Sequence, residues 1–317
     1  MEIKIKRPLS LVLALIITMS VTSCVVTDIS DIDGDTSGDI KDVVTTGDKA
    51  TKATDTNPEG SNNGGTASNT NATIEEKVCF EYDGLVVTAK EIVDHTIWGA
   101  GIKIHVENNS SKDYSIGVEQ AIVNNCMITD LFTCSVAAGK KANDTIYLSS
   151  SDLRESGISN IGQVELYFYV YDPATYERIY ETDCVTIKTS DYNVMDTTVN
   201  NAGYTLYDEN GIKIVGKYVD EYKLLGKAIV LHISNNSDKN IGISCDDMSI
   251  NGYMVTPLFS STIYAGKFAI DEITILSSDL EANNIKEISN FALKFRIHDA
   301  ETYQTIIETD ELSFSAK

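Results

Sequence analysis

The strongest constraint on the fold is that the sequence contains one domain twice. When residue n is aligned with residue n + 127, the chain matches itself without a gap from about Asp83 to Ile187. Matched segments include Asn108-Asn109-Ser110 with Asn235-Asn236-Ser237, Ala138-Gly139-Lys140 with Ala265-Gly266-Lys267, and Ser150-Ser151-Asp152-Leu153 with Ser277-Ser278-Asp279-Leu280. We therefore expect repeat 1 at residues 77–190, a polar connector at residues 191–203 and repeat 2 at residues 204–317.

Each repeat has the apolar pattern of β-strands. Apolar residues occupy every second position of residues 102–107 and 166–171, and again of residues 229–233 and 293–298. This period of two predicts strands with one buried face. The hairpin signals also recur at matched positions, as Asp83-Gly84 with Asn210-Gly211 and Asn124-Asn125 with Asn251-Gly252. These residues accept positive φ, which two-residue hairpins require.

One short helical turn is predicted between the later strands of each repeat. Asp152 and Asp279 have the chemistry of N-caps, and Gly157 and Asn284 that of a left-handed C-terminus. About seven strands and one crossover turn per repeat predict an all-β fold of two tandem Ig-like antiparallel β-sandwiches. A small β-barrel is the alternative.

Residues 1–23 have the pattern of an export signal. Lys4, Lys6 and Arg7 precede an apolar run at residues 9–21 that is too short to span a bilayer. The run ends in Val21-Thr22-Ser23-Cys24, which resembles the lipobox of bacterial lipoproteins. The resemblance implies that the signal is removed and that Cys24 carries a diacylglycerol. An ordinary secretory signal with a chance cysteine is the alternative.

Residues 24–76 are predicted to be a flexible acidic tether rich in Thr, Gly, Ser and Asn, because they contain too little apolar surface to fold. Asp31, Asp33, Asp35, Asp39 and Asp42 have the spacing of a calcium-binding loop. However, Thr36 occupies the position where such a loop needs Gly, so a solvated tether fits better.

The net charge excludes one class of partner. The chain has 47 acidic and 25 basic residues, a formal charge of -22. A protein that binds nucleic acid obtains its affinity from clustered Lys and Arg, so we expect no nucleic-acid partner. An anionic membrane surface would repel the chain for the same reason, and we expect membrane attachment only through the lipid on Cys24.

The cysteines and histidines indicate no reactive site. Five cysteines remain besides Cys24, and none has a cysteine at its repeat equivalent. Bridges between Cys126 and Cys134 or between Cys79 and Cys184 are possible, and free buried thiols are the alternative. His105 and His232 are repeat equivalents on the polar side of a strand pattern, where we expect surface or hydrogen-bonded side chains. The fifth cysteine is Cys245, and the other histidines are His95 and His298.

Nothing in the sequence indicates catalysis. Carboxylate pairs such as Asp246-Asp247 are expected in so acidic a chain, and no nucleophile motif, zinc spacing or phosphate-binding loop occurs. We therefore expect no enzymatic activity, no cofactor and no metal site. An envelope enzyme without a recognisable motif is the alternative.

The most suggestive surface is a row of tyrosines. Tyr167, Tyr169 and Tyr171 alternate with apolar residues on one predicted strand, with Tyr180 and Tyr147 as possible neighbours. Aromatic rows bind sugar rings by stacking and also anchor protein interfaces. Repeat 2 replaces this row by Lys294, Arg296 and His298, so the two repeats present different faces. These six residues form the candidate binding face.

The whole pattern resembles a family. A lipobox signal, a polar tether and repeated sandwiches with N-N-S, A-G-K and S-D-L turns are similar to poorly characterised Gram-positive surface lipoproteins with Ig-like domains, including those of the immunoprotective-extracellular type. The resemblance implies a fold and a location at the outer face of the cytoplasmic membrane. We expect a non-enzymatic binding or adaptor protein for a cell-envelope or extracellular partner, an unknown protein or glycan. A carbohydrate-binding protein that uses the tyrosine row is the alternative.

Overall fold

The computed structural model describes residues 71–95, 98–130 and 132–315. All of them belong to one compact unit of the chain, Ser61–Lys317. The predicted signal, Cys24, the acidic calcium-like spacing and most of the tether lie outside the described residues.

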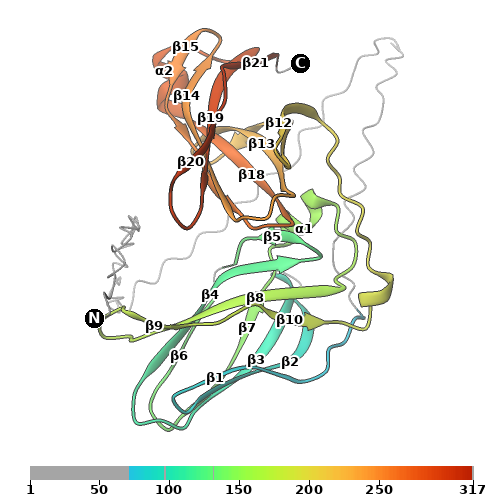
Figure 1. The fold of residues 1–317 in the computed structure, drawn as a ribbon, viewed down its shortest axis with the longest axis vertical. Helices are drawn as coiled ribbons and strands as arrows, with labels where there is room; N and C mark the ends of the chain where they lie inside the picture. Colours follow the sequence, from blue (N-terminus) through green and yellow to red (C-terminus); the bar gives the residue numbers. More distant parts are fainter. Residues whose placement is uncertain (1–70, 96–97, 131, 316–317) are drawn as a thin grey trace, which may run out of the picture. The chain divides into compact units, whose positions relative to one another are not determined.

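Repeat 1 is a sandwich of two sheets (Figure 1). The first sheet has the strand order β1-β2-β3-β7, and the second contains β4, β8 and β10 with the short strands β5, β6 and β9. The strands are β1 (Lys77–Tyr82), β2 (Leu85–His95), β3 (Gly99–Asn108), β4 (Tyr114–Val123), β5 (Cys126–Ile128), β6 (Thr133–Val136), β7 (Lys141–Tyr147), β8 (Gln163–Tyr171), β9 (Arg178–Glu181) and β10 (Val185–Lys188).

Repeat 2 forms the same two sheets. Its first sheet has the order β11-β12-β13-β18, and its second contains β14 and β19 with shorter strands. The strands are β11 (Tyr204–Glu209), β12 (Ile212–Lys223), β13 (Gly226–Asn235), β14 (Ile241–Ile250), β15 (Tyr253–Val255), β16 (Pro257–Leu258), β17 (Ser260–Ile263), β18 (Lys267–Leu276), β19 (Asn290–Asp299), β20 (Thr305–Glu308) and β21 (Leu312–Ser315). The pairs β3 and β13, β4 and β14, and β9 and β20 begin and end 127 residues apart. The all-β prediction and the Ig-like sandwich are confirmed.

The predicted hairpin turns are confirmed. Asp83 and Gly84 have φ of 42° and 82°, and their equivalents Asn210 and Gly211 have 55° and 78°. The second pair of turns has the same geometry, with Asn124 and Asn251 at 47° and 51°. Side chains that tolerate positive φ therefore set the register of the same hairpins in both repeats.

The crossover helices are α1 (Ser150–Ser156) and α2 (Ser277–Ala282), and the predicted N-caps were wrong. Ser149 caps α1 by accepting the backbone N–H of Asp152. The carboxylates of Asp152 and Asp279 instead accept the backbone N–H of Thr129 (2.7 Å) and of Thr256 (2.8 Å), because those loops lie beside the first helical turn. Gly157 is the left-handed C-cap of α1, as predicted. In repeat 2, Asn284 has φ of 53°, one residue beyond the C-cap of α2.

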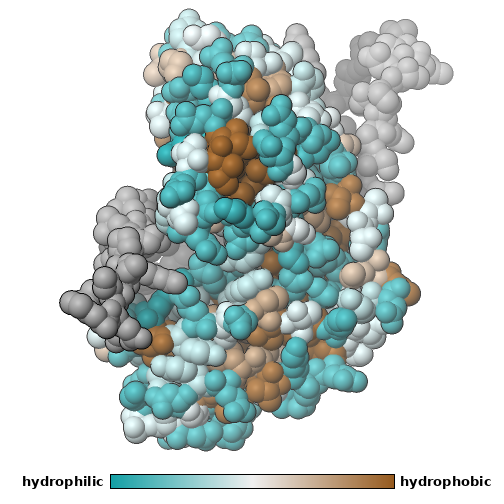
Figure 2. All heavy atoms as spheres, viewed as in Figure 1, coloured by the Kyte–Doolittle hydropathy of each residue, from teal (hydrophilic) through white to brown (hydrophobic). Residues whose placement is uncertain are grey.

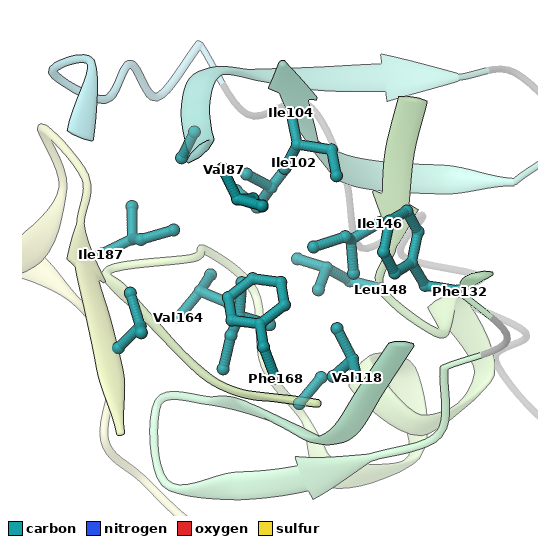
Figure 3. Close-up of a cluster of buried hydrophobic side chains, with 14 of the residues drawn as sticks. Val87, Ile102, Ile104, Val118, Phe132, Ile146, Leu148, Val164, Phe168 and Ile187 are labelled. Atoms are coloured by element: carbon teal, nitrogen blue, oxygen red, sulfur yellow. The ribbon is translucent and has the colours of Figure 1, made fainter. Parts of the chain in front are cut away.

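Each sandwich has its own hydrophobic core. In repeat 1, Val87, Ile102 and Ile104 of the first sheet face Val164 and Phe168 of the second (Figure 3). A separate cluster of buried residues, rich in isoleucine, fills repeat 2. Burial of these side chains is the main source of stability in each sandwich.

The two repeats are joined by a continued sheet. Strand β5 of repeat 1 pairs in parallel with β18 of repeat 2, with Cys126 opposite Phe268. Phe268 packs in the core of repeat 1, whereas Ile122 and Met127 pack in the core of repeat 2. The half-buried Lys267 also forms an ion pair with Glu165 across this junction, at 2.7 Å. The junction therefore fixes one repeat against the other by backbone pairing, packing and charge.

Candidate functional site

The tyrosine row lies on the outer face of β8. Tyr167, Tyr169 and Tyr171 alternate with buried core residues, and all three are half-buried. Other side chains cover each ring. Tyr167 makes an edge contact with Tyr264 of repeat 2 at 5.2 Å between ring centroids, and Tyr171 stacks on Tyr176 at 6.2 Å. The row is therefore not an open flat platform.

A cation already occupies one face of the row. The guanidinium of Arg178 lies 4.0 Å from the centroid of the Tyr169 ring. Glu119 and Glu181 hold it there through ion pairs of 2.5 Å and 3.6 Å. This arrangement combines a cation–π contact with two carboxylates. Burial raises the pKa of the Tyr169 phenol, which therefore stays protonated at neutral pH.

The row opens into a pocket that both repeats build. This tyrosine pocket has a volume of about 450 Å³. Repeat 1 lines it with Tyr167, Tyr169 and Arg178, and repeat 2 with Tyr264 and Tyr303. Burial raises the pKa of both Tyr167 and Tyr264, so their phenols are hydrogen-bond donors rather than anions. The pocket can hold a polar or cationic group between aromatic rings.

Tyr303 belongs to a turn that both repeats retain. Asp172, Thr175 and Tyr176 recur as Asp299, Thr302 and Tyr303. Both tyrosines have φ of 58°, which is unfavourable for an aromatic residue, and they are 78% and 67% exposed. Backbone hydrogen bonds from Thr302 and Glu301 lower the pKa of Asp299 to about 2. The turn thus holds an exposed tyrosine ring in place in each repeat.

An acidic pocket adjoins the tyrosine pocket and shares Glu119 and Thr262 with it. It has a volume of about 360 Å³ and is lined by Asp130, Asp152 and Asp271, among other residues. Burial, aided by the charge of Glu119, raises the pKa of Asp130 to about 6. Burial also raises the pKa of Asp271. Both shifts show that negative charge is disfavoured in this pocket.

The basic row of repeat 2 lies on β19 and is largely neutralised. Lys294 and Arg296 pair with Asp247 (3.8 Å) and Asp246 (2.9 Å) of the neighbouring strand β14. His298 stacks on Tyr303 at 5.8 Å, and its Nδ1 atom is buried without a hydrogen-bond partner among the described residues. None of the three residues lines the tyrosine pocket. Tyr303 links this row to the pocket, because His298 stacks on it.

The two suggested neighbours of the tyrosine row pack elsewhere. Tyr180 stacks on Tyr82 at 4.5 Å, at the edge of the repeat 1 core. Tyr147 contacts His95 and Trp98. The residues that do accompany the row are Tyr264, Tyr303, Arg178 and the glutamates at 119 and 181. One signal for Tyr303 was present in the sequence, because it is the repeat equivalent of Tyr176.

The expectation for one histidine was wrong. His105 hydrogen-bonds Asn143 and Glu107, as expected for a surface strand. His232 is only 1% exposed, and neither ring nitrogen has a hydrogen-bond partner in the described structure. It is buried because Phe268 stacks on it at the junction, at 5.3 Å. Burial, with a contribution from Lys217, lowers the pKa of His232 to about 4, so the ring is neutral at physiological pH.

The five cysteines within the described residues are free thiols. Neither of the two possible bridges is formed. Burial raises the pKa of Cys126 and of Cys245 to about 12 and that of Cys134 to about 11, so these thiols are not nucleophiles at neutral pH. Cys184 is exposed.

The described residues contain no group of three or more His, Cys, Asp or Glu placed to hold a metal ion. Within the same part of the chain, no helix has the length and apolar character needed to cross a membrane.

Comparisons with known proteins add little to this site. No protein-family model matches the sequence, and no curated protein matches it. Among solved structures, the Salmonella enterica SafA pilin in complex with the SafB chaperone shows 9% identity and a TM-score of 0.23, covering 74% of this chain and 98% of that chain. The YadV chaperone shows 10% identity and a TM-score of 0.23, covering 68% and 92%. A protein of unknown function from Porphyromonas gingivalis W83 shows 12% identity and a TM-score of 0.19, covering 68% and 90%. Likeness at this level carries no argument about partners.

Proposed function

We propose that this chain is a non-enzymatic binding protein, held by lipid on Cys24 at the outer face of a Gram-positive cytoplasmic membrane. In this proposal, it receives part of a protein partner in the tyrosine pocket. The observation that carries the proposal is that Tyr167 and Tyr169 of repeat 1 and Tyr264 and Tyr303 of repeat 2 line one pocket. Such a pocket exists only while the two repeats are joined.

The divergence of the repeats supports a shared site rather than two copies of one site. Tyr167 has Lys294 as its repeat equivalent, and Tyr264 has Ala137. Each repeat therefore contributes aromatic residues that the other lacks. The junction supplies the fixed geometry that a two-sided pocket requires, through the pairing of β5 with β18 and the ion pair between Lys267 and Glu165.

The covered rings favour a protein partner over a carbohydrate. A sugar ring stacks on an open aromatic face, but Arg178 covers a face of Tyr169, and Tyr264 abuts Tyr167. Tyrosine and arginine side chains at the centre of a pocket are instead typical of protein interface anchors. Carbohydrate binding is therefore the competing result that the experiment must distinguish.

Crosslinking on intact cells tests the proposed function. Photoreactive benzoylphenylalanine placed at position 303 should capture a partner protein, whereas the same group at position 222 should not. Tyr222 is 95% exposed and does not line the tyrosine pocket, so it is the matched control. Equal capture from both positions, or binding to a glycan array that is lost in the Tyr303→Ala variant, would contradict a protein partner in this pocket.

The lipid anchor is tested separately. Replacing Cys24 by Ala removes the thiol that the lipobox resemblance assigns to the diacylglycerol, and the net charge of -22 gives no electrostatic attraction to an anionic bilayer. The variant should therefore be recovered in the medium. Retention in the membrane fraction would show that something other than lipid on Cys24 holds the protein there.

A further inference from the structure

The two adjoining pockets are far more acidic than the chain as a whole. Their lining contains the six carboxylates of Glu119, Asp130, Asp152, Glu181, Asp271 and Glu301, against the single base Arg178. The whole chain has 47 acidic and 25 basic residues, or about two to one. The lining of the two pockets is therefore more acidic than the chain average.

Most of this charge has no basic partner among the residues that the structure describes. Glu119 and Glu181 share Arg178, as described above. The other four carboxylates form no ion pair with any described residue. Asp130, Asp152 and Asp271 are partly buried as well, and each accepts a backbone N–H but has no positive charge within ion-pair distance among the described residues. A positive charge brought into the pockets would be attracted by these unpaired carboxylates.

Arg178 shows the geometry in which the pocket accepts a cation. Its guanidinium lies on the Tyr169 ring between two carboxylates. The side of the tyrosine pocket formed by repeat 2 also combines aromatic rings with a carboxylate, those of Tyr264, Tyr303 and Glu301. Repeat 2 contributes no basic side chain to the described lining of this pocket. That half of the pocket has the chemistry of a cation site, and its described lining residues supply no cation.

We propose that the tyrosine pocket and the acidic pocket together bind a basic segment of the partner protein, with a Lys or Arg side chain against Tyr264, Tyr303 and Glu301. This inference rests on the proposed function and names the chemistry of its partner. A segment with several basic residues fits better than a single small amine, because the two pockets adjoin and can take successive side chains. The face of the molecule seen in Figure 2 is largely hydrophilic, with hydrophobic residues in separate patches.

Calorimetry on the purified full chain tests the inference. The probe is a peptide of alternating Arg and Gly, and its control is the same peptide with neutral citrulline at every Arg position. The Arg peptide should bind and the citrulline peptide should not. Binding of the Arg peptide should weaken as the salt concentration rises from 50 to 300 mM, because salt screens the attraction between the Arg side chains and the carboxylates.

Matched variants separate a site from general charge attraction. Glu301→Gln should weaken binding of the Arg peptide by about two- to fivefold, the range expected for one exposed ion pair, and Tyr303→Ala should weaken it similarly. Glu209→Gln, on an exposed residue of β11, and Tyr222→Ala should leave binding unchanged. Equal loss in Glu301→Gln and Glu209→Gln would mean that only net charge attracts the peptide, and would overturn the inference.

The outcomes also separate this inference from the proposed function. If both peptides bind equally and Tyr303→Ala weakens both, the pocket binds a partner but not through a cation, so only the inference fails. If neither peptide binds while crosslinking from position 303 still captures a protein, the same conclusion follows. If neither peptide binds and crosslinking captures nothing, both proposals fail.

Discussion

Replacing Asn235 by Ala removes the side chain that closes the loop between β13 and β14. Asn235 is completely buried, and its Nδ2 atom donates to the backbone oxygens of Lys239 (2.7 Å) and Ile263 (2.9 Å). Its Oδ1 atom accepts hydrogen bonds from the backbone N–H and the hydroxyl of Ser237, at 3.0 Å and 2.6 Å. Asn108 makes the same set of bonds in repeat 1.

The size of the loss in stability depends on whether water can reach the groups that lose a hydrogen bond to Asn235. A hydrogen bond contributes about 1 kcal/mol net, and a buried carbonyl left without a donor costs about 1–3 kcal/mol. Ile263 is completely buried, so its carbonyl loses a partner that water cannot easily replace, whereas Lys239 is exposed and Ser237 is partly exposed. We therefore expect Asn235→Ala to lower the free energy of unfolding by about 3 kcal/mol, or more than a hundredfold in the unfolding equilibrium.

Urea denaturation of the full chain, followed by far-ultraviolet circular dichroism, measures this change. The matched control is Asn236→Ala, one residue along the chain. Asn236 is exposed, and its contact in the turn is a backbone N–H bond to Gly211 that alanine keeps. The control should change the free energy by less than about 0.5 kcal/mol. Asn108→Ala should reproduce the large effect in repeat 1. Equal small effects of Asn235→Ala and Asn236→Ala would refute the assignment of Asn235 as the group that closes this loop.

Three further predictions concern the junction and the thiols. Phe268→Ala should lower the free energy of unfolding by about 3 kcal/mol in thermal denaturation, because Phe268 is 8% exposed, whereas Leu258→Ala, at a position 45% exposed, should have little effect. Burial lowers the pKa of His232 from 6.5 to about 4, so the unfolded state takes up a proton before the folded state as the pH falls, and the free energy of unfolding should decrease from pH 7 to pH 4. His232→Phe should remove about 3 kcal/mol of that decrease. The same pH profile in the variant and the wild type would contradict this. Among the five described cysteines, Cys184 should react fastest with a thiol reagent in the native protein, and a fast phase that persists in Cys184→Ala would contradict this.

The sequence allowed the strands and turns to be predicted because their signals are local. Alternating apolar residues determine which face of β3 or β8 is buried, and Asp83-Gly84 or Asn210-Gly211 adopts a hairpin turn whatever packs beyond it. The duplication strengthened each prediction by giving it twice. The N-cap of α1 was missed because Asp152 and Ser149 both have capping chemistry, and the choice depended on where the Thr129 loop lies.

The candidate site was only half predictable for a related reason. The tyrosines at 167 and 169 could be placed on one face of a strand from their spacing. Tyr264 is almost a hundred residues away on another sandwich, and nothing local links it to Tyr167. Arg178 likewise reaches Tyr169 only because β9 pairs with β8. Spacing within a strand predicts a face, but it does not predict what covers that face.

The junction could have been recognised from positions where the two repeats differ, rather than from those where they are identical. Phe268 has the exposed Lys141 as its repeat equivalent, and Ile122 has Ser249. In an isolated sandwich, an apolar residue at the position of Lys141 would meet water, because Lys141 lies at the edge of its sheet. Phe268 and Ile122 are buried because each packs in the core of the other repeat. An apolar residue in one copy where the other is polar therefore marks a surface that the neighbouring copy covers. By the same reasoning, the polar Lys141 on the edge strand β7 does not mark a surface of the kind that Phe268 forms on β18. A lysine at the edge of a sheet also opposes pairing with another strand.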